Sequence, residues 1–93
     1  MKKVVIATAV RTPIGDFGGS LRRVEPVGLS ATVMKECLNR AQLENKHLDQ
    51  VILGNCFSPI DQNIARLSSL ILGLPYDIPG LTINCACASA SQA

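Results

Sequence analysis

Three short apolar segments, separated by helix-like segments, most strongly constrain the fold of this sequence. Residues 3–10 contain three valines and an isoleucine, and residues 51–57 and 81–84 have a similar apolar, β-branched character. Nearly continuous apolar strands are typical of parallel sheets, because helices cover both faces of such sheets. The three segments therefore predict three buried parallel strands.

The segments between these runs have the periodicity of helices. From Pro26 to Ala41, apolar residues recur at steps of three and four, and proline suits the first helical position. A second helix is expected to begin after Asp61 or Asn63, either of which can cap it, and Gly73 marks its end. The expected apolar faces are Val27, Ala31, Met34, Cys37, Leu38 and Ala41 in the first helix, and Ile64, Leu67, Ser68 and Ile71 in the second.

The order β-α-β-α-β, followed by the opening of a further helix, predicts an α/β fold with right-handed crossovers. Ninety-three residues allow at most one small domain.

Aromatic residues are limited to Phe17, Phe57 and Tyr76, so the core must be aliphatic. The net charge is +2 and the basic residues are scattered, which gives no support for nucleic-acid binding.

The N-terminus and the cysteines bear on the compartment. The apolar run of residues 4–10 is at the short end for a signal peptide and reads equally well as a buried strand. No stretch is long enough to span a bilayer, so we expect no membrane association and a cytoplasmic protein with reduced thiols. Cys37, Cys56, Cys85 and Cys87 have poor spacing for zinc, and no metal site is expected.

The segment from Ile83 to Ala93 places cysteines where chemistry is plausible. The expected strand ends at Asn84, and small residues allow a helix to begin at about Cys87. Unpaired N–H groups and the helix dipole would stabilise a thiolate at that point. Cys85, at the strand end, competes for the role, but the dipole favours Cys87. From spacing alone, both cysteines can equally be small buried residues.

Three parts of the sequence resemble the thiolase family. Residues 83–93 (INCACASASQA) resemble its acyl-enzyme signature, in which an apolar residue and Asn lie four and three positions before the nucleophile, and this register selects Cys87. Residues 10–21 (VRTPIGDFGGSL) are similar to the family's opening. Residues 51–55 and 61–66 resemble its second strand and a GQNPAR segment. The departures from the usual residues are Asp61, Ile64, Ala90 and Ser91.

The resemblance implies an acyltransferase of fatty acid metabolism with Cys87 as its catalytic nucleophile. The reaction would be reversible Claisen condensation of acetyl-CoA to acetoacetyl-CoA, or thiolysis of 3-ketoacyl-CoA, through an acyl-enzyme. Coenzyme A thioesters would be substrates, with no permanently bound cofactor and no cofactor-binding residue assigned. In the family's layered α-β-α-β-α fold, residues 1–93 would be part of the N-terminal domain, ending just inside the nucleophile's helix, of a homodimer or homotetramer.

Other interpretations remain open at this point. The one histidine, His47, is expected at the sheet edge opposite Cys87, on the surface and too far away to act as its base. The family's Gly-His-Pro and Cys-x-Gly motifs are absent, so the 93 residues alone are expected to be inactive. The alternatives are a truncated, inactive fragment, another condensing enzyme of the superfamily such as a ketoacyl synthase, or a small redox or metal-binding protein that uses Cys85 and Cys87.

Overall fold

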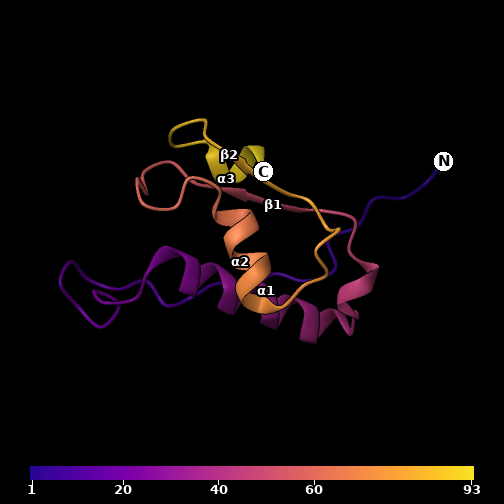
Figure 1. Ribbon diagram of the computed structural model, residues 1–93, viewed down its shortest axis with the longest axis horizontal. Coiled ribbons are helices and arrows are strands. Elements are labelled where there is room, and N and C mark those ends of the chain that lie inside the picture. Colours follow the sequence, from indigo (N-terminus) through magenta and orange to yellow (C-terminus); the bar gives the residue numbers. More distant parts are fainter.

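The computed structural model describes residues 1–93, apart from the side chain of Lys46. Its described elements are α1 (Pro26–Ala41), the short 3-10 helix η1 (Asn45–His47), β1 (Val51–Gly54), α2 (Ile64–Leu72), β2 (Gly80–Ile83) and α3 (Ser89–Gln92). Helices α1 and α2 pack against each other below the sheet in Figure 1, and α3 lies above it. The order of strands and helices confirms the predicted α/β class.

The two strands are parallel and adjacent. Their register runs from Val51 opposite Gly80 to Gly54 opposite Ile83. Two further hydrogen bonds extend the ladder, because the N–H of Val51 donates to the carbonyl of Pro79 and that of Asn55 donates to Ile83, each at 3.0 Å. Helix α2 makes the crossover between the strands, as the alternation of elements predicted.

Helix α1 has the predicted bounds. Pro26 occupies the first turn, where a missing N–H costs nothing, and Gln42 ends the helix in a left-handed conformation with φ 54°. Val27 and Ala31 are buried. Met34 and Leu38, further along the same face, pack against the core of Val51, Ala65, Leu74 and Ile78.

Helix α2 is capped by one of the two residues that the sequence offers for this role. The side chain of Asn63 accepts a hydrogen bond from the N–H of Arg66, and Gly73 ends the helix with φ 77°. The predicted buried face is only partly correct, since Leu67 and Ile71 are 38% and 63% exposed. Ile64 and Ser68 are buried as predicted, together with Ala65 and Ser69.

Hydroxyl side chains lie on the buried face of α2. The hydroxyl groups of Ser30 on α1 and Ser68 on α2 hydrogen-bond to each other, which satisfies two polar side chains inside the contact. The hydroxyl of Ser69 donates to the carbonyl of Ala65 at 2.8 Å. Small side chains form this contact, whereas Leu67, Leu70 and Ile71 of α2 are exposed.

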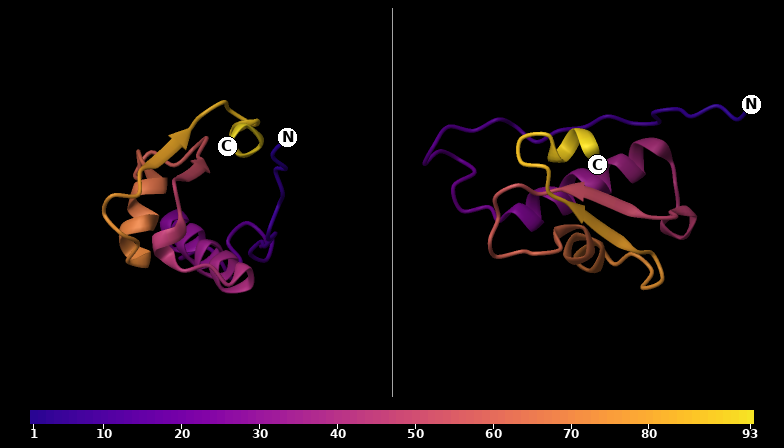
Figure 2. Two further views of the ribbon diagram at one scale, coloured as in Figure 1. Left: turned by 90° about the vertical axis from the view of Figure 1, so that its right-hand side faces the viewer. Right: turned by 90° about the horizontal axis from the view of Figure 1, so that it is seen from above.

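The strand predicted at residues 3–10 is wrong for this structure. These residues, all of them described, form no strand, and Val4 and Ile6 are 98% and 90% exposed. A strand needs a neighbour to satisfy its backbone groups. In the end-on view of Figure 2, the N-terminal segment runs apart from β1, so the free edge of β1 does not pair with it.

The second strand is shorter than predicted and stops at Gly54. The side chain of Asn55 bonds within the following loop instead: its Nδ2 donates to the carbonyl of Asp61 at 3.1 Å, and its Oδ1 accepts from the N–H of Ser58 at 3.2 Å. Asparagine favours such local bonds over continuation of a strand.

Within the described residues, none of the helices combines the length and the apolar character needed to cross a membrane.

Candidate active site

The turn between β2 and α3 contains the two candidate cysteines. Cys85 and Cys87 are both exposed there, just beyond the carboxyl end of β2. Helix α3 begins at Ser89, two residues later than predicted, because Ala86 takes a left-handed conformation with φ 50°. Cys87 therefore lies in the turn that leads into α3 and not within the helix itself. The stabilisation of its thiolate by the helix dipole stays a prediction.

The side chain of Ser89 fixes this turn. Its Oγ accepts a hydrogen bond from the N–H of Cys85 at 2.9 Å and donates one to the carbonyl of Ala86 at 2.6 Å. Ser89 is only 4% exposed, so both bonds are shielded from water. From the strand side, Oδ1 of Asn84 accepts from the N–H of Ala86 at 3.0 Å, as in an Asx-turn. The backbone around Cys87 is thus held from both ends.

Gly54 allows α3 to lie directly on β1. A Cβ atom at this position would stand 2.5 Å from the backbone N of Ala90 and from the carbonyl carbon of Ser89. No larger residue fits without moving α3. Sequence reasoning did not assign a role to Gly54 or Ser89. A glycine inside a strand is a known sign of close backbone approach and could have indicated the first, whereas Ser89 showed only as a small residue.

A second cluster of hydrogen bonds fastens α2 to β2. Oδ1 of Asn63 accepts from the hydroxyl of Thr82 at 2.7 Å, and Nδ2 of Asn63 donates to the carbonyl of Gly80 at 3.2 Å. The Thr82 hydroxyl oxygen also accepts from the N–H of Ala65 at 3.1 Å. Arg66 donates through Nη1 to two carbonyls of the loop before β2. These bonds position the strand that leads into the nucleophile turn.

His47 lies where the sequence placed it. It is exposed and belongs to η1, before the amino end of β1, whereas Cys87 follows the carboxyl end of β2. Since the strands are parallel, the two residues are at opposite ends of the sheet. His47 is the one histidine in the sequence, so residues 1–93 place no imidazole beside Cys87.

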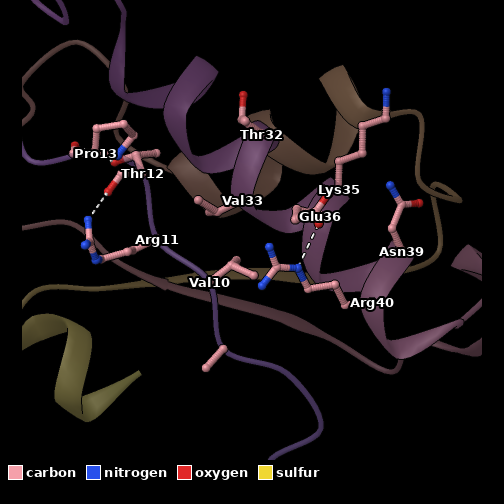
Figure 3. A pocket seen from close by; sticks show the side chains of 11 residues that line it. Val10, Arg11, Thr12, Pro13, Thr32, Val33, Lys35, Glu36, Asn39 and Arg40 are labelled. Atoms are coloured by element: carbon pink, nitrogen blue, oxygen red, sulfur yellow. Dashed lines mark hydrogen bonds and ion pairs between the residues drawn. The ribbon is translucent and has the colours of Figure 1, made fainter.

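A hollow of about 1190 Å³ runs between residues 9–13 and helix α1. Figure 3 shows Arg11, Lys35 and Arg40 around it, and Arg40 is ion-paired with Glu36 at 2.8 Å. Among the described residues that line the hollow there is no cysteine or histidine, and we assign it no chemistry.

No group of three or more His, Cys, Asp or Glu side chains in the described part of the chain could hold a metal ion.

The fold and the turn together define a parallel α/β unit that presents a cysteine between a strand and a helix. The sequence profile of the thiolase N-terminal domain matches residues 4–93. The chain belongs to the thiolase family.

Individual relatives agree with this assignment. An acetyl-CoA acetyltransferase of Escherichia coli is 43% identical over 90 residues, which are 96% of this chain and 23% of that protein. An acetyl-CoA acetyltransferase sequence of Clostridioides difficile is 41% identical over 90 residues, and 84% of it is covered. The chain thus spans about a quarter of the first relative and most of the second.

Solved structures of thiolases have the same fold over this region. The crystal structure of the Bacillus anthracis acetyl-CoA acetyltransferase superposes with a TM-score of 0.89 at 43% identity, over 96% of this chain and 23% of that one. A thiolase from Ascaris suum in complex with coenzyme A gives a TM-score of 0.84 at 35% identity, over 90% and 22% of the two chains.

Proposed function

We propose that Cys87 is the nucleophile of a thiolase-type acyl-CoA acyltransferase to which residues 1–93 contribute part of the N-terminal domain, ending just inside the nucleophile's helix. The observation that supports this best is the exposed thiol of Cys87 in a turn that Ser89 and Asn84 hold from both sides. Membership of the family supplies the reaction class. Acetyl-CoA and acetoacetyl-CoA are the proposed substrates, in a cytoplasmic homodimer or homotetramer of the complete protein.

The chemistry is a two-step acyl transfer. The Cys87 thiolate attacks the 3-keto carbon of acetoacetyl-CoA, so that a sulfur–carbon bond forms and the bond between C2 and C3 breaks. The electron pair stays on C2 of the departing acetyl-CoA carbanion, which takes up a proton. The thiol of free coenzyme A then loses its proton and attacks the acetyl-cysteine, which yields acetyl-CoA and restores the thiolate.

The chain's own residues serve mainly to place the nucleophile. Ser89 and Asn84 fix the backbone on either side of Cys87, and this limits the positions that the thiol can take. Ala86 and Ala88 flank the cysteine and leave room for an acyl group. His47 is too remote to accept the thiol proton, so we infer that the groups that transfer protons come from the rest of the complete protein.

Brief exposure of the complete protein to acetoacetyl-CoA tests this proposal. Trypsin separates the cysteines, because Cys37 lies in residues 36–40, Cys56 in residues 47–66, and both Cys85 and Cys87 in the peptide that begins at Leu67. Mass spectrometry is expected to find one acetyl group on that last peptide, assigned to Cys87 by fragmentation. The Cys85→Ser variant should retain this acetyl group, and Cys87→Ser should lose it.

Two results would contradict the proposal. One is an acetyl group on Cys85 in the unchanged protein, and the other is undiminished acetyl uptake by the Cys87→Ser variant. The same assay on residues 1–93 alone addresses the inactive-fragment alternative. Because these residues place no histidine beside Cys87, we expect the isolated segment to show no turnover of acetoacetyl-CoA.

A further inference from the structure

We propose that Cys85 and Cys87 are a redox pair, and that a peroxide converts them to an internal disulfide that blocks the thiol of Cys87. The disulfide itself depends only on the geometry of the turn. Its effect on acyl transfer rests on the proposed function of Cys87. Both thiols are exposed and therefore accessible to a small oxidant.

The backbone of the turn brings the two cysteines close together. Only Ala86 separates them, and its φ of 50° is left-handed. Two residues of extended chain span about 7 Å, whereas a disulfide joins Cα atoms about 4.4 to 6.8 Å apart. A left-handed residue in the middle shortens the span toward this range.

The same hydrogen bonds that position the nucleophile also favour closure of the ring. The N–H of Cys85 donates to Ser89 Oγ, and the N–H of Ala86 donates to Asn84 Oδ1. The carbonyl of Cys85 accepts from the N–H of Ala88 at 3.1 Å. Because the turn is already held in its bent form, joining the two sulfur atoms requires little ordering of the backbone.

The other two cysteines belong to different elements. Cys37 is on α1 and is half-buried, whereas Cys56 is exposed in the loop that follows β1. Cys56 therefore has the same access to oxidant as the pair, but it lacks a cysteine two residues away. This difference makes Cys56 an internal control for simple exposure.

The oxidation proceeds in two balanced steps. The Cys87 thiolate attacks hydrogen peroxide, so that the oxygen–oxygen bond breaks, hydroxide leaves and the sulfur becomes a sulfenic acid. The thiol of Cys85 then attacks that sulfur, the sulfur–oxygen bond breaks, and the disulfide forms with release of water. An external thiol reverses the change by thiol–disulfide exchange.

A disulfide across one intervening residue is reversible by its nature. Such a small ring departs from relaxed disulfide geometry, and strained, exposed disulfides are the more easily reduced ones. The pair would also protect the nucleophile, since a sulfenic acid without a nearby thiol is oxidised further to irreversible sulfinic and sulfonic acids. Cys85 would thus convert oxidative damage at Cys87 into a recoverable state.

A several-fold molar excess of hydrogen peroxide, enough to supply three oxygens to each cysteine, is added to the complete reduced protein to test the proposal. After alkylation of remaining thiols and tryptic digestion, the peptide that begins at Leu67 is expected to lack two hydrogens and to resist alkylation. Prior treatment with dithiothreitol should restore both alkylation sites. The Cys85→Ser variant should instead show two or three added oxygens on Cys87, and the Cys56→Ser variant should form the disulfide as the unchanged protein does.

The redox proposal and the catalytic proposal fail separately. A disulfide between residues 47–66 and the peptide beginning at Leu67, or the same oxygen addition at Cys87 with and without Cys85, would overturn the redox pair. Acetyl uptake measured on the reduced protein tests the nucleophile independently. If both proposals are correct, peroxide abolishes acetyl uptake, dithiothreitol restores it in the unchanged protein, and restoration is lost in Cys85→Ser.

Discussion

The sequence profile of the thiolase N-terminal domain covers both residues 4–24 and residues 51–93, but these two regions differ in how they fold. In the first region, Ile14 and Phe17 are 89% and 108% exposed. In the second, Ala65, Leu74 and Ile78 are at most 4% exposed. An apolar sequence is buried only where another surface covers it, and in the second region the elements cover one another, with Met34 and Leu38 of α1 also packed against the core.

The hydrogen bonds of the two regions differ in the same way. Between residues 16 and 24, the turns close over three residues, for example from the N–H of Gly19 to the carbonyl of Asp16 at 2.8 Å. In the second region, side chains join positions far apart in the sequence, as Asn63 does with Thr82 at 2.7 Å. Local bonds shape a loop, but long-range bonds fix one element against another.

The two regions are expected to differ most in the stability that is lost when a glycine is replaced by a larger residue. Gly54→Val should lower the free energy of unfolding of the complete protein by about 3 kcal/mol, because the new side chain overlaps the backbone of α3. Gly15→Val is the matched control, since a Cβ there stands 3.6 Å from Leu21 and fits. Urea unfolding followed by circular dichroism measures both. Equal costs would contradict the close contact between β1 and α3.

Loss of the Ser89 hydroxyl is expected to have the next largest effect. Ser89→Ala removes two shielded hydrogen bonds and leaves the N–H of Cys85 without its partner, at a cost of about 2 kcal/mol. We also expect slower acetylation of Cys87, because the turn is less well fixed. The exposed Ser91 provides the control variant Ser91→Ala. An unchanged acetylation rate in Ser89→Ala would argue against a positioning role.

The Thr82 hydroxyl offers a further comparison. Thr82→Val keeps the side-chain shape but removes its bonds to Asn63 and to the N–H of Ala65, and should cost about 1.5 kcal/mol. Thr12→Val in the first region removes only a bond to the neighbouring carbonyl of Pro13 and should cost about 0.5 kcal/mol or less. Thermal unfolding of both variants checks the order, and a larger cost at Thr12 would reverse the comparison.

The smallest effect is expected at the N-terminal apolar run. Val4 is 98% exposed and Val51 is 8% exposed, so Val4→Ala should change stability by about 0.5 kcal/mol or less and Val51→Ala by about 2 kcal/mol. Urea unfolding of the complete protein measures both. A similar cost at the two positions would show that residues 3–10 are covered there, and would restore the strand that the sequence predicts.

The sequence by itself determined the elements whose signals are local. Helix α1 begins at Pro26, whose ring fixes φ, and ends at Ala41, after which Gln42 is left-handed. The apolar periodicity between these ends and both end signals arise from neighbouring residues. Gly73 ends α2 for the same reason. The spacing of residues in the signature also singles out Cys87 and Asn84, although the role of Cys87 stays a prediction.

Only the tertiary structure decided which surfaces meet. It buried Ala65 and Ser69 of α2, beside the predicted Ile64 and Ser68, and left Leu67 and Ile71 exposed. It gave Gly54 its role, because α3 lies on β1. It also left residues 3–10 without a partner. Backbone preferences are set by adjacent residues, whereas burial and strand pairing depend on contacts between segments distant in the sequence.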